Sequence, residues 1–158
     1  IARTSIYRYY EDKRQIFSQA IRQLADQVED ECSEILTRTG MSNHDRILEV
    51  MRSVLDLIFE HRQLLSEILQ YLLEEKRSGS HIRHKVRRHT IGIKVLLSHL
   101  LREGILKKEF RSHDVQISAL LFYGVFESAI LQIAVTDMDD RLLSDRQIEM
   151  LLDGIRSC

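Results

Sequence analysis

The sequence of 158 residues contains no proline and only six glycines, so it has few residues that interrupt helices. Its two cysteines, Cys32 and Cys158, lie too far apart to fit a metal-binding or redox motif. A disulfide framework is therefore not expected, and the reducing cytoplasm is the expected compartment. There is no basic-then-apolar signal segment at the start. A glycine-rich phosphate loop, a nucleophile elbow and zinc-ligand spacing are also missing, which argues against an enzyme.

With 44% hydrophobic and 30% charged residues, the chain suits one soluble domain with a sizeable core. Apolar residues recur every three or four positions, which predicts amphipathic helices. We expect Asp12 to cap the first helix and Gly40 and Gly104 to end the first and fourth. The expected helices cover residues 13–38, 43–75 with a break near 60–63, 81–103, 115–135 and 145–155, with a loop at 76–80. No strand is indicated, so the prediction is an all-α domain of antiparallel neighbours.

The segment 115–135 is apolar on nearly all sides and is long enough to span a membrane. Five polar residues interrupt it, and a carboxylate in mid-bilayer is costly, so a soluble buried helix is the preferred interpretation. The interrupting residues are Gln116, Ser118, Glu127, Ser128 and Gln132. Burial on two sides requires two partners. We expect the chain's own core on one side and, on the other, a second copy of the chain, with the helix at 145–157 alongside.

Charge is distributed in blocks although the whole chain carries only −1. Residues 1–22 carry a net +3 and residues 76–113 a net +9, whereas residues 23–75 carry −8 and residues 114–158 carry −5. The two basic blocks therefore need separate explanations.

The first basic block contains residues 3–10 (RTSIYRYY), followed by Lys13 and the apolar pair Ile16-Phe17. This pattern resembles the end of the helix-turn-helix in TetR-type transcriptional regulators, where a short recognition helix is followed by a tyrosine-rich junction. The resemblance in motif covers residues 1–25. It implies a DNA-binding part at 1–25 and an all-α effector-binding and dimerisation domain at 26–158, with the dimer formed by the last two helices. The family's two preceding helices are not in this sequence, so we expect the natural chain to be longer at its start.

The chemistry of these side chains suits DNA. Arginine pairs with guanine, and threonine or serine accepts several base edges. Tyrosine hydroxyls and a lysine at a helix start suit phosphate oxygens. The expected DNA-binding residues are Arg3, Thr4, Ser5, Tyr7, Tyr9 and Lys13. The alternative is that Tyr7 and Tyr9 only cover the base of the following helix.

The second basic block starts a helix with cations, although the helix dipole favours acids there. Three interpretations remain open. The block can be a solvated face near the acidic segment, it can bind a phosphate-bearing effector through Arg83, Arg87 and Arg88, or it can bind a metal through histidines. The histidines concerned are His81, His84 and His89.

A loose similarity of residues 102–124 to the branch of TetR-type regulators that senses fatty acyl-CoA supports the phosphate-bearing effector. Such an effector needs an apolar pocket. The candidates for its wall are Leu57, Ile68, Tyr71, Leu96, Leu100, Phe122 and Phe126, with His99 and Glu127 as polar residues that could orient a headgroup. Each of these nine residues can instead be ordinary core or a partner in a core or dimer hydrogen bond.

Together these observations predict a cytoplasmic homodimeric TetR-like regulator, a repressor whose operator affinity changes when a small apolar or amphipathic effector binds. No metal, cofactor or membrane is expected. The rival hypothesis is an all-helical module that binds lipids or thioesters and does not contact DNA.

Overall fold

The computed structural model describes residues 2–74, 81–136 and 140–158, and leaves out the side chains of residues 2–7, 9–11 and 81–85 as well. The described chain is helical. Its elements are α1 (Ala2–Thr37), α2 (Asn43–Glu60), α3 (Arg62–Glu74), α4 (His81–Leu106), α5 (Val115–Leu131), the π-helical turn η1 (Gln132–Thr136) and α6 (Arg141–Ile155). Within those ranges there is no strand, and Phe110 and Arg156 form an isolated antiparallel bridge. The all-α prediction is confirmed.

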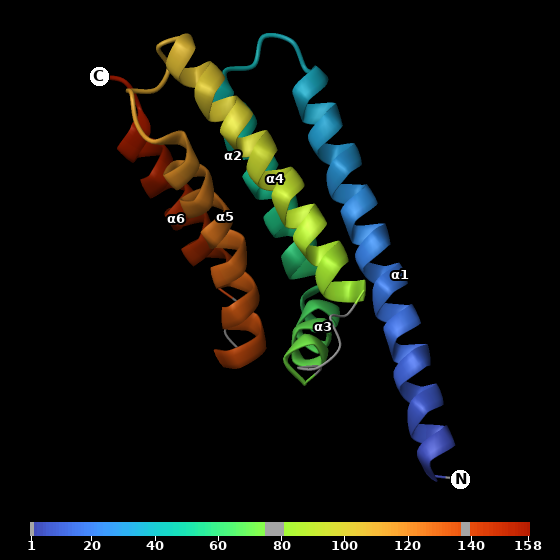
Figure 1. Cartoon of the computed structure of the whole chain (residues 1–158). Helices are drawn as coiled ribbons and strands as arrows, with labels where there is room; N and C mark the ends of the chain where they lie inside the picture. Colours follow the sequence, from blue (N-terminus) through green and yellow to red (C-terminus); the bar gives the residue numbers. More distant parts are fainter. Residues whose placement is uncertain (1, 75–80, 137–139) are drawn as a thin grey trace.

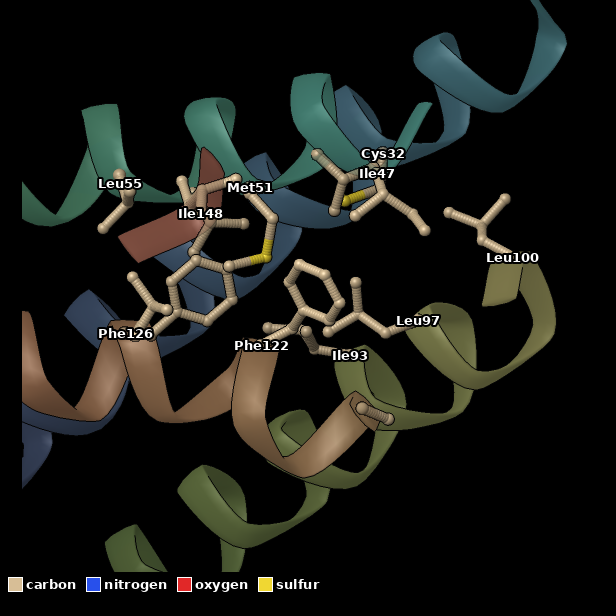
Figure 2. Packing of buried hydrophobic residues seen from close by; sticks show 14 of the residues in the cluster. Cys32, Ile47, Met51, Leu55, Ile93, Leu97, Leu100, Phe122, Phe126 and Ile148 are labelled. Carbon is tan, nitrogen blue, oxygen red and sulfur yellow. The ribbon is translucent and has the colours of Figure 1, made fainter. Parts of the chain in front are cut away.

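The helices pack as a bundle in which α2 and α4 lie between α1 on one side and α5 with α6 on the other (Figure 1). α3 lies across one end of the bundle (Figure 1). The main core is formed by apolar faces of α1, α2, α4, α5 and α6. Figure 2 shows Phe122 and Phe126 of α5 beside Met51 of α2 in this core. A smaller apolar cluster of Phe17, Ile21, Ile68 and Tyr71 joins α1 to α3.

Side-chain caps explain where several helices begin. Ser42 accepts a hydrogen bond from the backbone N–H of Asp45 at the start of α2, and Asp114 accepts two at the start of α5. The Glu109 carboxylate also accepts the backbone N–H of Asn43 at 2.7 Å, so the loop after α4 is fastened to the positive end of α2.

Four expected boundaries need comment. The break near residues 60–63 is confirmed, because α2 ends at Glu60 and α3 begins at Arg62. The expected start at Asp12 is wrong: α1 begins at Ala2, so Asp12 is an exposed residue inside the helix. α6 begins at Arg141, capped by Asp140, four residues before the predicted start. The predicted loop at 76–80 lies outside the described residues.

Gly104 does not end α4, which continues to Leu106. The chain turns instead at Lys108, which has a positive φ of 60°. A Cβ on Gly104 would lie 2.2 Å from Cδ2 of Phe110, whose ring is buried against the helix. The glycine is therefore required by the close approach of a ring, and not by the backbone conformation of a helix end.

Candidate functional site

An apolar cavity of about 210 Å³ lies among the first five helices, at the end of the bundle near α3. Most of its wall consists of aliphatic side chains and one phenyl ring. The lining residues are Ile21, Leu24, Ala25 and Val28 of α1, Val54, Leu57 and Ile58 of α2, Leu65, Ile68, Leu69 and Leu72 of α3, Val86, His89, Thr90 and Ile93 of α4, and Tyr123, Phe126 and Ile130 of α5. Such a cavity can hold a small apolar molecule.

The polar groups of this cavity come from α4 and α5. The hydroxyls of Thr90 and Tyr123 are hydrogen-bonded to each other at 2.7 Å. Burial raises the pKa of the Tyr123 hydroxyl, so it stays protonated at neutral pH. Burial also lowers the pKa of His89, against the opposing effect of Glu29, and this favours the neutral imidazole. The cavity thus presents uncharged hydrogen-bonding groups.

Of the nine residues predicted for an effector pocket, Leu57, Ile68 and Phe126 line this cavity. Tyr71 packs in the α1–α3 cluster, with its ring centroid 5.3 Å from that of Phe17. Leu100 and Phe122 are buried in the main core and do not line the cavity.

The remaining three predicted residues lie elsewhere. Leu96 lines a separate surface groove between α1 and α4. The His99 side chain is 63% exposed and faces Glu103 on the next turn at 3.7 Å. Glu127 is exposed on α5. Neither polar residue lines the cavity, so the sequence pattern did not identify its polar groups.

The groove between α1 and α4 has a volume of about 600 Å³ and mixed chemistry. Arg88, one of the three predicted anion ligands, lines it together with Arg22, Asp26 and Glu29. Arg87 is exposed and does not line it. The side chain of Arg83 lies outside the described residues.

The metal-binding interpretation of the second basic block gains no support from the part of the chain that the structure describes, where no three His, Cys, Asp or Glu side chains are grouped. His89 lies at the cavity wall, and the side chains of His81 and His84 lie outside the described residues.

The candidate DNA-binding residues belong to the first turns of α1, at the end that extends away from the other helices in Figure 1. The side chains of five of them, Arg3, Thr4, Ser5, Tyr7 and Tyr9, lie outside the described residues. The sixth, Lys13, is half-buried, and its Nζ lies 5.7 Å from the centre of the Phe17 ring. Their contacts with DNA stay a prediction.

Apolar side chains are exposed along α5 and α6. Val115–Thr136 is long and apolar enough, by length and composition alone, to cross a membrane, yet α5 contributes Phe122, Val125 and Phe126 to the core. Its outer face is not covered by any of the residues that the structure describes. The exposed residues are Ile117, Leu120, Leu121 and Leu131 of α5 and Leu142 and Met150 of α6.

Sequence reasoning missed His89, Thr90 and Tyr123 as cavity residues. Thr90 and Tyr123 are 33 positions apart in the sequence, and only the packing of α4 on α5 brings their hydroxyls together. It also missed the contribution of α1, because an amphipathic pattern shows that a face is buried without showing whether it meets side chains or a cavity.

No family model and no curated protein matches the chain. Among solved structures, a TetR transcriptional regulator from Chloroflexus aurantiacus has a TM-score of 0.66 and 18% identity, covering 97% of this chain and 79% of that chain. A bacterial regulatory protein in the TetR family from Rhodococcus has a TM-score of 0.68 and 16% identity, with the same coverage. The chain therefore has the all-α fold found in TetR-family regulators.

Proposed function

We propose that the chain is part of a DNA-binding transcriptional regulator of the TetR type, which binds its operator as a homodimer and responds to a small molecule. The observation that carries this proposal is the agreement of the fold with two such regulators over 97% of the chain. The tyrosine-rich motif at the start of α1 and the apolar cavity in the bundle add support from two separate parts of the molecule.

α1 connects the two proposed sites. Its N-terminal turns carry the candidate DNA-binding residues, and farther along it contributes Ile21, Leu24, Ala25 and Val28 to the cavity wall. A molecule that binds more tightly to one position of α1 than to another shifts the equilibrium between those positions. We propose that the shift changes the spacing of the two recognition segments in a dimer and weakens operator binding, which makes the protein a repressor.

The outer face of α5 and α6 supplies the proposed dimer interface. It carries six exposed large apolar side chains on two helices that pack against each other. Pairing of this face with the same face of a second copy would bury these side chains symmetrically. In such a dimer α5 would be covered on both sides.

DNA binding is tested by selecting from a random pool of duplex DNA with the immobilised protein, expressed from its complete coding sequence so that the two helices expected before the recognition helix are included. The expected result is a palindromic sequence with half-sites about one helical turn, ~34–36 Å, apart. The substitution Arg3→Ala should weaken the base preference at one position of each half-site. The control substitution Arg111→Ala, at an exposed loop residue, should leave that preference unchanged. If no sequence is enriched, and DNA is retained only weakly and to the same extent at low and high salt, the regulator is rejected. The rival lipid- or thioester-binding module would then be favoured.

Dimerisation is tested by sedimentation of variants that add one charge each. Leu121→Glu places a carboxylate on the proposed interface and should shift the protein toward monomer. Ile16→Glu is a matched control, because Ile16 is a similarly exposed apolar residue on α1. Equal sedimentation of both variants and the unmodified protein would place the interface elsewhere.

A further inference from the structure

We propose that the cavity binds a compact, uncharged, largely apolar molecule with one oxygen function, which forms a hydrogen bond with the Thr90–Tyr123 hydroxyl pair. This proposal extends the function proposed above and rests on it. A substituted phenol or a short branched alcohol represents this class. The proposal differs from the acyl-CoA effector expected from the sequence, and three properties of the cavity lead to it.

The first property is size. An apolar cavity of ~150 Å³ holds a benzene molecule, and drug-sized ligands occupy pockets of roughly 300–1,000 Å³. The cavity of about 210 Å³ lies between these values. It therefore suits one ring with a short substituent, and it is too small to enclose a long acyl chain together with a nucleotide.

The second property is the absence of charge. Among the lining residues that the structure describes, none is Asp, Glu, Lys or Arg. Lys94 lies with its Nζ 4.9 Å from the centre of the Tyr123 ring, but it lines a different groove, between α4 and α5, and not the cavity. His89 is held in its neutral form by burial. An ionised ligand would bury its charge without an opposite charge among the described lining side chains, which is strongly unfavourable.

The third property is hydrogen-bonding capacity. Two hydroxyl groups carry two hydrogens, and the 2.7 Å bond between Thr90 and Tyr123 uses one of them. The pair can therefore donate its second hydrogen to a ligand oxygen and can accept one in return. Both side chains line the cavity, and the other described lining residues are apolar except His89, so a ligand oxygen gains most beside this pair.

The ligand class is tested by isothermal titration of the full chain with matched probes. The probes are 4-isopropylphenol, its anionic analogue 4-isopropylbenzoate, isopropylbenzene and palmitoyl-CoA. We expect the phenol to bind and the benzoate to bind more than about 100-fold more weakly, because its charge has no partner among the described lining residues. Equal affinity for the benzoate, or binding of palmitoyl-CoA without binding of the phenol, would overturn the proposed class.

The hydroxyl pair is tested with Tyr123→Phe, which keeps the ring and removes the hydroxyl. The affinity for 4-isopropylphenol should fall about 2- to 10-fold, and the affinity for isopropylbenzene should stay the same. Tyr71→Phe is the matched control, since Tyr71 is a buried tyrosine that does not line the cavity. Equal losses of affinity in the two variants, or a loss of affinity for both probes in Tyr123→Phe, would show that the Thr90–Tyr123 pair does not recognise the ligand.

These outcomes separate the ligand class from the proposed regulator. If palmitoyl-CoA alone binds and releases DNA, the ligand class is wrong and the regulator stands. If the phenol binds with the expected selectivity while the protein selects no DNA sequence, the ligand class stands and the regulator is wrong. If no probe binds and the protein still selects a palindromic operator, the ligand class is again wrong.

Discussion

The close contact between Gly104 and Phe110 gives a sharp test of the packing at the end of α4. A Cβ added at Gly104 would meet Cδ2 of Phe110 at 2.2 Å and Cε2 at 2.3 Å. The ring cannot move away easily, since Phe110 is 2% exposed and its backbone N–H donates to the Gly104 carbonyl. Gly104→Ala should therefore destabilise the protein through overpacking.

The expected magnitude combines two opposite terms. Overpacking a well-packed core costs about 1–3 kcal/mol, and a contact this short belongs at the upper end of that range. Alanine is favoured over glycine inside a helix by about 1 kcal/mol. The net loss in the free energy of unfolding should be about 2 kcal/mol. It can be measured by urea denaturation followed by circular dichroism at a fixed protein concentration, because dimerisation adds a concentration-dependent term.

The decisive measurement is a double-mutant cycle with Phe110→Leu. Leucine has no Cε2 and can rotate its methyl groups away, so Gly104→Ala should become neutral or stabilise the protein by up to about 1 kcal/mol in that background. If Gly104 were needed for a helix-ending backbone conformation, Gly104→Ala would cost the same with either residue at position 110. Equal costs in the two backgrounds would refute the packing explanation.

Three further predictions concern other parts of the fold. Arg141 forms ion pairs with Asp56 of α2 and Asp145 of α6, and its side chain is only 28% exposed. Arg141→Ala should therefore lower the free energy of unfolding, measured by urea denaturation, by about 1 kcal/mol, and a loss no larger than that of the more exposed Arg38→Ala would contradict this. Burial lowers the pKa of His89 from 6.5, so the unfolded chain binds the proton more readily and the free energy of unfolding should fall as the pH drops below about 6.5. His89→Gln should reduce this dependence of stability on pH, and an unchanged dependence would contradict the role of His89. Burial raises the pKa of Cys32 to about 11 while Cys158 is exposed, so a thiol reagent should label one cysteine of the folded chain quickly and the second only on unfolding, whereas two fast equivalents would show that Cys32 is accessible.

The positions of the helices could be predicted well because apolar residues recur every three or four positions in most of them, and because α5 is a long and almost continuous apolar segment. Their ends were harder to predict. Asp12 is a good capping residue by type, yet α1 continues through it, and α6 begins four residues before its expected start. Helix ends depend on competition between neighbouring caps and on packing, so local residue type decides them poorly.

The candidate site could be predicted only in part. Leu57, Ile68 and Phe126 were identified from apolar faces that point into the bundle, and they line the cavity. The same reasoning selected Leu100 and Phe122, which are buried in the main core and do not line the cavity. Periodicity reports that a side chain is buried, and it contains no information on whether the opposite helix leaves space beside it.

The sequence by itself determined the all-α class, the succession of the helices and the motif that suggested a DNA-binding regulator, because these depend on residue type and on spacing along one segment. The tertiary structure decided where the cavity lies, that its described lining contains no Asp, Glu, Lys or Arg, and that Thr90 and Tyr123 share a hydrogen bond at its wall. It also decided that Gly104 makes room for Phe110. Each of these facts joins residues from different elements, and their distances are set by how the helices pack.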